Sequence, residues 1–147
     1  KVYEQFCEGA KEAFETAKRI IPFLVAMLLA IRLLRDAGVV QAVTEFLRGP
    51  LESIGFPPDL LSLAAMRPMS GSASQGIFVD LVKTHGADSM IARMAATIYG
   101  STETTFYVLA VYFGSVGIRK TRHAVAVGLT ADIIATVCAI AACRLLL

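Results

Sequence analysis

Long apolar segments, separated by short polar or proline- and glycine-containing stretches, make up most of this sequence. The segments are residues 20–35, 57–84, 88–118 and 124–143. A helix needs about 20 apolar residues to cross a bilayer core of roughly 30 Å. Segment 124–143 meets this length, and 20–35 just spans when its arginine side chains reach toward the far surface. The pattern predicts an all-α, polytopic membrane protein.

A polar run, Gly-Ser-Thr-Glu-Thr-Thr at residues 100–105, interrupts the segment 88–118. Neither half of the segment spans alone, but the two together do. Glu103 then lies at membrane depth, where an acid costs about 2.5–3.5 kcal/mol and is rare unless functional. Gly100 weakens the helix, and the hydroxyls satisfy backbone groups that unwinding frees. We predict a broken transmembrane helix with a binding site at its break; the alternative is a surface loop of a soluble protein.

Segment 57–84 contains two short apolar arms around a serine- and glycine-rich tip at residues 69–76. Each arm has roughly 9 or 10 residues, which at about 1.5 Å per residue reaches half the membrane depth. We therefore predict a re-entrant helical hairpin; a helical hairpin of a soluble fold and a flexible linker are the alternatives. Pro58 and Asp59 favour a helix start, while Gly49-Pro50 is expected to interrupt the half-polar segment before it.

The first 19 residues differ from the rest because apolar and charged side chains alternate with helical spacing. This pattern predicts an amphipathic juxtamembrane helix at 1–19, followed by a membrane domain at 20–147. The helix either lies on the cytoplasmic membrane surface or packs on a partner. Its apolar positions are Val2, Tyr3, Phe6, Ala10, Ala13, Phe14 and Ala17, and its charged ones include Glu4, Glu8, Lys11, Glu12 and Glu15.

Composition favours the membrane interpretation. The chain of 147 residues is 56% hydrophobic and only 18% charged, whereas soluble domains carry about 25% charged residues. The net charge is +2, and no basic stripe with interleaved aromatics is present, so nucleic-acid binding has no support. The length is too short for a transporter of the duplicated kind, which suggests a partner subunit or a second copy.

Catalytic and metal-binding patterns are missing from the sequence. The cysteines, Cys7, Cys138 and Cys143, lack metal-ligand spacing and are interpreted as small apolar residues. His85 and His123 are expected to be solvated. There is no Ser-His-Asp set, no paired carboxylates at enzyme spacing and no phosphate-binding loop. We expect neither an enzyme nor a resident cofactor or metal.

The hairpin tip and the helix break are expected to converge near mid-membrane, where helix N-termini and unwound carbonyls hold a small polar solute or an ion. Glu103 and Asp132 are the candidates for coupling to Na⁺ or H⁺, although Asp132 can instead pair with a buried arginine such as Arg67. The predicted substrate-binding residues are Ser70, Ser72, Ser74, Gln75, Ser101, Thr102, Glu103, Thr104 and Thr105.

Three motifs resemble those of the spore maturation protein B family. They are Arg-Pro-Met-Ser-Gly-Ser at 67–72, Tyr-Gly-Ser-Thr-Glu-Thr-Thr-Phe-Tyr at 99–107 and Tyr-Phe-Gly-Ser-Val-Gly-Ile-Arg-Lys-Thr-Arg at 112–122. The resemblance covers nearly the whole chain. It implies a bacterial membrane protein with a "nucleoside recognition" or gate domain, which concentrative nucleoside transporters and ferrous iron permeases share in looser form.

The resemblance implies a multi-pass subunit of the bacterial cytoplasmic membrane that works with a spore maturation protein A-like sister subunit or a second copy. By analogy with nucleoside transporters, the hairpin tip and the broken helix form half of a site for a nucleoside-like or other small polar solute. A non-transporting scaffold or assembly factor in spore maturation or envelope function is the alternative. Family members begin with a further apolar helix before the segment matching Lys1 to Glu4, so the chain is expected to lack one.

Overall fold

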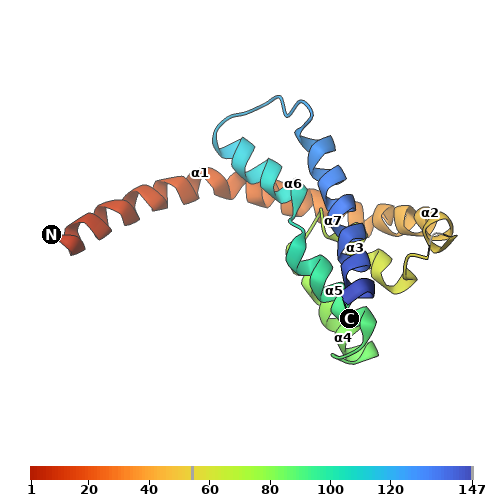
Figure 1. Cartoon of the computed structure of the whole chain (residues 1–147). Helices are drawn as coiled ribbons and strands as arrows, with labels where there is room; N and C mark the ends of the chain where they lie inside the picture. The colour runs from red at the N-terminus through yellow and green to blue at the C-terminus, as the bar shows by residue number, and fades with distance from the viewer. Residues whose placement is uncertain (54, 147) are drawn as a thin grey trace.

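The computed structural model describes residues 1–53 and 55–146. These residues form helices joined by turns and short loops, with no strand among them (Figure 1), so the all-α prediction is confirmed. The elements in chain order are α1 (Val2–Asp36), α2 (Val39–Ser53), the 3-10 turn η1 (Pro58–Leu60), α3 (Leu61–Met66), α4 (Gly71–His85), α5 (Met90–Ser101), α6 (Thr105–Val108), the π-helical turn η2 (Leu109–Phe113) and α7 (Ala124–Leu146).

The core lies where α3, α4, α5 and α7 meet. Ala95 of α5 and Ala139 of α7 are almost completely buried, and such small side chains let two helices approach closely. Larger side chains fill the space around them. The buried cluster consists of Leu60, Leu63, Leu81, Met94, Ala95, Ile98, Ala139, Ile140 and Cys143. This packing fixes α5 directly before the predicted helix break.

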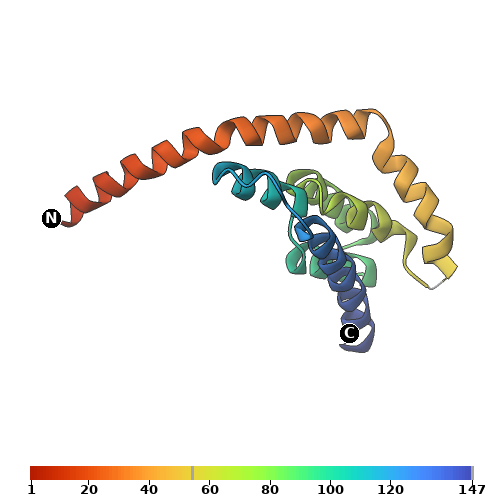
Figure 2. The ribbon, with the colours of Figure 1, turned by 90° about the horizontal axis from the view of Figure 1, so that it is seen from above.

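Helix α1 runs without interruption from Val2 to Asp36, so the predicted boundary between residues 19 and 20 falls inside it. Its second half crosses the other helices, and its first half extends away from them (Figure 2). Pro22 lies well inside this helix rather than in its first turn. The helix accommodates it because Pro22 is on the exposed side, where solvent can reach the carbonyl left without an N–H partner.

Segment 57–84 forms two arms, η1 with α3 and then α4, around a shorter tip than predicted. Ser70 is the N-cap of α4, and its hydroxyl accepts a hydrogen bond from the Ala73 N–H at 3.3 Å. Helix α4 therefore begins at Gly71, and the prediction of an irregular stretch up to residue 76 was wrong. The re-entrant assignment itself concerns the membrane boundary and stays a prediction.

Proline has different effects at the two ends of the α2–η1 connection. Pro58 is the first residue of η1, as its fixed φ angle favours, and Asp59 follows in the same turn. By contrast, α2 continues through Gly49 and Pro50 to Ser53, so the expected interruption was wrong. Both residues are exposed, which leaves the carbonyl that Pro50 cannot satisfy within reach of solvent.

Among the described residues, only α7 is long and apolar enough to cross a membrane. It has 23 residues and contains the whole of the predicted span 124–143. The helix buries little of its apolar surface against the rest of the chain, since Val127, Ile133, Ile134 and Val137 are all more than half exposed. An apolar helix with a mostly uncovered surface is typical of a membrane span rather than of a buried core helix.

The predicted break in segment 88–118 is present. Helix α5 ends at Ser101, residues 102–104 are not helical, and α6 begins at Thr105. The second half then widens into the π-helical turn η2, a deviation that often accompanies functional sites. Two close contacts hold this second half in place, because Gly114 lies against the Phe23 ring of α1 and Gly128 lies against Thr105.

We expect Gly128→Ala to destabilise the fold. A Cβ atom at this position would lie 2.6 Å from Thr105 Cγ2, so α7 or the start of α6 must move, at a cost of about 1–3 kcal/mol. Thermal unfolding in detergent measures the effect. Gly76→Ala is the matched control, since Gly76 is helical with nothing within 4 Å of such an atom, and it should leave stability unchanged or raised. Equal midpoints for both variants would contradict the packing described.

Candidate functional site

A buried arginine on the hairpin binds the helix break. Arg67 follows α3, is only 8% exposed, and donates from Nε to Thr102 Oγ1 at 2.9 Å and from Nη1 to Thr104 Oγ1 at 3.3 Å. Its Nη2 atom donates to the carbonyl oxygens of Tyr99, at 3.0 Å, and of Thr102. These carbonyls are among those that a helix end leaves without partners. The guanidinium therefore replaces the hydrogen bonds that the break removes.

We refer to the hydrogen bonds of Arg67 with Tyr99, Thr102 and Thr104 as the clasp. Aromatic rings and a further backbone hydrogen bond strengthen it. The guanidinium carbon of Arg67 lies 4.6 Å from the centre of the Tyr99 ring, which itself stacks on Phe78 of α4. The Phe106 N–H donates to the Pro68 carbonyl at 2.9 Å, so the start of α6 is also tied to the hairpin. Among the described residues no carboxylate lies within ion-pair distance of Arg67. Its positive charge is thus compensated by dipoles and a π-face alone.

Asp132 of α7 has a different partner from the one we considered. Thr105, the first residue of α6, donates from Oγ1 to Asp132 Oδ2 at 2.6 Å. The suggested Asp132–Arg67 pair is therefore not formed, because Arg67 points to the carbonyls and hydroxyls at the end of α5 while Asp132 faces the start of α6. The close contact of Gly128 with Thr105 brings the two helices near enough for this bond.

One open groove lies between the hairpin tip and the break. It has a volume of about 300 Å³ and combines hydroxyls of the tip and the break with the carboxylate of Glu103 and the apolar side chains of α1. The N-terminus of α4 opens into it. The lining residues are Met27, Leu28, Met69, Ser70, Gly71, Ser72, Glu103, Thr104 and Tyr107. Donors, acceptors and apolar surface thus meet in one place, which is typical of small-molecule sites.

A second groove, of about 400 Å³, lies on the α7 side of the break. It is lined by Ser101, Thr102, Glu103, Thr105, Val108, Leu109, Ala124, Gly128, Ala131, Asp132 and Ala135. Glu103 contributes to both grooves, and in the second it shares the lining with Asp132. Carboxylates together with hydroxyls supply the oxygen ligands that hard cations prefer. Among the described residues, however, no group of three or more His, Cys, Asp or Glu side chains is placed to hold a metal ion.

Some of the predicted site residues have side chains that can contact a solute in a groove. Others form hydrogen bonds within the fold or point elsewhere. Ser70 and Ser72 have their hydroxyls 3.4 Å apart at the first groove. Ser74 is fully buried and donates to the Ser70 carbonyl at 2.7 Å, while Gln75 is exposed and lines neither groove. The structure therefore does not bring Ser74 or Gln75 to the break, because α4 has already begun and turns them away.

At the break itself, Thr102 and Thr104 are buried and bind Arg67, whereas Glu103 between them is exposed. The Glu103 carboxylate accepts a hydrogen bond from the Thr104 N–H at 2.8 Å. Sequence reasoning found the break but missed the role of Arg67 and the contribution of Tyr107 to the first groove. The role of Arg67 could have been inferred from its position in an apolar segment, because a buried charge needs several hydrogen-bond partners.

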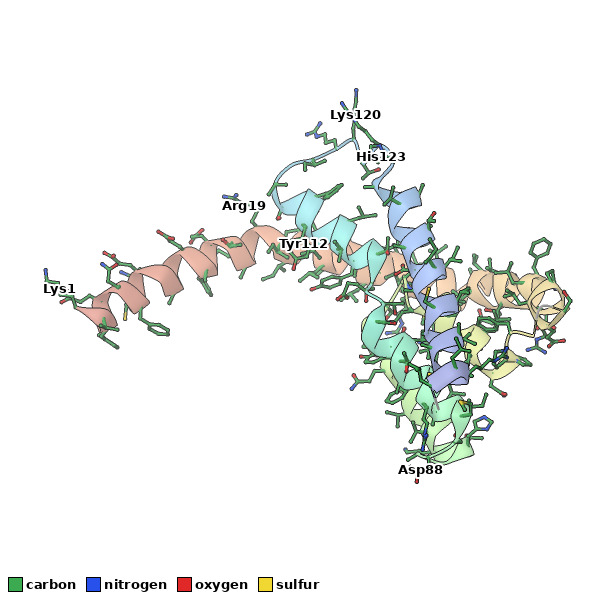
Figure 3. The ribbon with its side chains drawn as sticks, in the orientation of Figure 1. Lys1, Arg19, Asp88, Tyr112, Lys120 and His123 are labelled. Carbon is green, nitrogen blue, oxygen red and sulfur yellow. The ribbon has the colours of Figure 1, made fainter. Side chains whose placement is uncertain are left out.

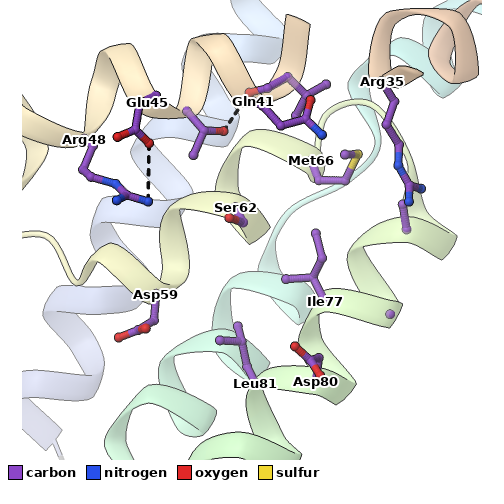
Figure 4. Close-up of a pocket in the computed structure, with 14 residues that line it drawn as sticks. Arg35, Gln41, Glu45, Arg48, Asp59, Ser62, Met66, Ile77, Asp80 and Leu81 are labelled. Atoms are coloured by element: carbon purple, nitrogen blue, oxygen red, sulfur yellow. Dashed lines mark hydrogen bonds and ion pairs between the residues drawn. The ribbon is translucent and has the colours of Figure 1, made fainter. Parts of the chain in front are cut away.

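A larger hollow than either groove lies elsewhere, between α2 and the α3–α4 arms (Figure 4). Its volume is about 740 Å³, and its lining combines charged side chains of both signs with apolar ones. Glu45 and Arg48 pair there at 3.5 Å. None of the predicted site residues lines it. Pocket size alone would therefore locate a binding site in this hollow, whereas the sequence pattern locates it at the helix break. We place the candidate site at the break, where a buried charge and a distorted backbone coincide.

Comparison with known proteins decides the family. Residues 17–119 match the gate family described as "Nucleoside recognition". Spore maturation protein B of Bacillus subtilis (strain 168) is 47% identical over 138 residues, which cover 94% of this chain and 78% of the relative. The chain belongs to the spore maturation protein B family. No solved structure matches it.

Membership of this family shows in which domain of the protein the candidate site lies. A spore maturation protein B homologue with a gate domain is a membrane protein, and α7 supplies at least one candidate transmembrane helix. The gate match contains both polar segments, the hairpin tip and the break, whereas α7 with Asp132 follows it in the chain. In this spore maturation protein B homologue, the clasp between Arg67 and the break therefore lies within the gate domain.

Arg67→Lys is expected to loosen the break although it keeps the positive charge. A lysine ammonium cannot reproduce the planar fork that binds two hydroxyls and two carbonyls, so buried acceptors lose partners at a cost on the order of 2–3 kcal/mol. Hydrogen exchange of residues 99–106 should accelerate, and the unfolding midpoint should fall. Arg93→Lys on the exposed side of α5 is the matched control. Unchanged exchange in the Arg67 variant would show that the clasp does not stabilise the break.

Proposed function

We propose that this protein is a transport or gating subunit that binds a small polar solute, nucleoside-like or otherwise, between the tip of the α3–α4 hairpin and the helix break. The observation that carries the proposal is the position of Glu103. It is the exposed residue between two threonines that Arg67 holds, and it lines both grooves at the break.

The first groove supports recognition of a hydroxylated solute. Glu103 is an acceptor for hydroxyl or amino groups, and Ser70 and Ser72 can either donate or accept. Tyr107 and Leu28 add apolar surface that can cover the face of a ring. Because Thr104 is held by Arg67, the acidic side chain next to it starts from a fixed backbone position. A fixed position lowers the entropy that solute binding must overcome.

The second groove supports coupling to H⁺ or Na⁺. Glu103 and Asp132 both line it, and Thr105 connects α6 to Asp132 through its hydroxyl. Protonation or Na⁺ binding removes negative charge from Glu103 or Asp132. The second groove then has a weaker attraction for a further cation. Glu103 belongs to both grooves, so the occupancy of one affects the other. This shared residue is the physical basis we propose for coupling.

The subunit acts, in this proposal, in the bacterial cytoplasmic membrane with a spore maturation protein A-like sister subunit or a second copy. Both grooves are open in the single chain, and apolar side chains on several helices remain exposed. Transporter sites usually lie between two repeats or subunits, so a partner that closes the grooves fits the shape.

A second candidate function, a non-transporting scaffold or assembly factor, has its own support. The side-chain oxygens of Thr102, Thr104 and Thr105 take part in internal hydrogen bonds, and each carboxylate at the break accepts one as well. These internal hydrogen bonds would be sufficient for a protein whose polar segments only stabilise a complex. The two functions differ in whether a solute enters the grooves.

Replacing Glu103 with Gln should abolish solute transport while leaving membrane insertion intact. The amide oxygen can still accept from the Thr104 N–H, so the backbone stays in place, but the negative charge is lost. Uptake of a panel of nucleosides and other polar solutes into proteoliposomes measures the effect. Glu52→Gln, at an exposed position of α2, is the matched control. If wild-type protein takes up a solute and the Glu103 variant does so equally well, the proposal fails; uptake by neither protein across the panel favours the scaffold.

A further inference from the structure

Three cations lie directly before α7, in a part of the chain that contains no acid. Arg119, Lys120 and Arg122 belong to an irregular stretch at residues 118–123, which ends where α7 begins. The sequence has no aspartate or glutamate from residue 104 to residue 131. We refer to residues 118–123 as the basic loop.

The positive charges of the basic loop have no carboxylate partner among the described residues. All three side chains are exposed, and none of them forms an ion pair there. Figure 3 shows Lys120 at the outermost point of the loop. The start of a helix carries a positive partial charge, so cations placed before α7 do not stabilise this helix either. Their attraction is therefore available to an anionic surface outside the chain.

The position of the basic loop relative to a membrane follows from α7. Among the described residues, this helix is the one that is long and apolar enough to cross a bilayer. When it does so, the residues before it lie at the level of the lipid headgroups. The residues that lead into the loop fit such a boundary, because Val116 and Ile118 are apolar and are 69% and 46% exposed. Apolar side chains next to cations are typical of segments at a bilayer interface.

The opposite end of the molecule carries charges of both signs. Figure 3 shows Asp88 at the far end from the basic loop. In the turn of α4 before this residue, His85 Nε2 lies 3.8 Å from Asp59 Oδ1. Arg144, in the last turn of α7, donates to the carbonyl of Gly55. The two ends of α7 therefore differ, since charged groups at one end have partners within the chain and the basic loop at the other end is positive alone.

We propose that the basic loop binds anionic phospholipid headgroups of the cytoplasmic leaflet and so orients α7 with its N-terminus on the cytoplasmic side. That leaflet has a negative surface potential, which attracts cationic segments next to a transmembrane helix. An acidic protein surface would attract the same charges. The lipid surface fits better because the start of α7 and the exposed apolar side chains beside the loop put the cations at headgroup depth.

This orientation also sets the depth of the helix break. Asp132 follows the start of α7 at Ala124, and at about 1.5 Å per residue it lies about 12 Å below the cytoplasmic headgroups. A bilayer core is roughly 30 Å thick, so Asp132 and its partner Thr105 lie near its middle. The binding of lipid by the basic loop does not depend on whether a solute enters the grooves at the break.

Fluorescence of a single tryptophan measures lipid selectivity at the loop, because the chain contains no native tryptophan. The full chain with Ile118→Trp is reconstituted in bilayers of phosphatidylcholine brominated on its acyl chains, which quenches the tryptophan. Unbrominated phosphatidylglycerol should restore the fluorescence at least about fivefold more effectively than unbrominated phosphatidylcholine, since each cation near an anionic surface contributes about this factor. Leu145→Trp in the last turn of α7 is the matched control and should show no preference.

Exchange of the three cations of the loop for glutamine, in the Ile118→Trp background, should remove the preference for phosphatidylglycerol. The same preference at both tryptophan positions, or a preference that survives the exchange, overturns the proposal. Equal effects of the two lipids at position 118 overturn it in favour of an acidic protein surface.

Thiol labelling in intact cells gives an independent measurement of the orientation. In the full chain without its native cysteines, a reagent that cannot the membrane pass should label Asp88→Cys from outside. It should label His123→Cys only after the cells are permeabilised. Labelling of His123→Cys in intact cells, or of neither cysteine in them, overturns the proposal.

Discussion

The structure depends on how one buried guanidinium compensates a helix break. Unwinding residues 102–104 leaves carbonyls at the end of α5 without helical partners, and Arg67 binds two of the carbonyls and two of the threonine hydroxyls there. A buried charge without a carboxylate partner is costly on its own. Likewise, an unwound backbone inside an apolar environment is costly on its own. The guanidinium donates to the carbonyls of the unwound backbone, and these carbonyls in turn compensate its buried charge. The hairpin and the broken helix therefore form one unit.

This arrangement determines which polar groups are free to bind a solute. Thr102 and Thr104 are buried by the clasp, and Thr105 is bound to Asp132, so Glu103 is the break residue whose acidic side chain stays exposed. The tip contributes Ser70 and Ser72 because Ser70 starts α4 immediately after it. The close approach of Gly128 to Thr105 sets the distance between the break and α7. A solute site here therefore rests on contacts among α3, α4, α5 and α7.

Local sequence patterns predicted the elements but not all of their limits. The apolar length of 124–143 predicted α7, and the run at 100–105 predicted the break, because each signal is contained in consecutive residues. The tip was shorter than predicted because one capping hydroxyl decided where α4 begins. The partners of Arg67 lie 32 to 37 residues away, and two of its bonds go to backbone carbonyls, which any residue type supplies. Sequence spacing cannot predict contacts of that kind.

The clasp holds a break that we expect water and solutes to reach within the membrane. The decisive measurement is the rate at which a water-soluble thiol reagent alkylates the Ser72→Cys variant, in intact membrane vesicles and without other cysteines. We expect rapid alkylation there and none of Val137→Cys on the exposed apolar face of α7, where lipid would block the reagent. An unreactive cysteine at position 72, or equal rates at both positions, would contradict it.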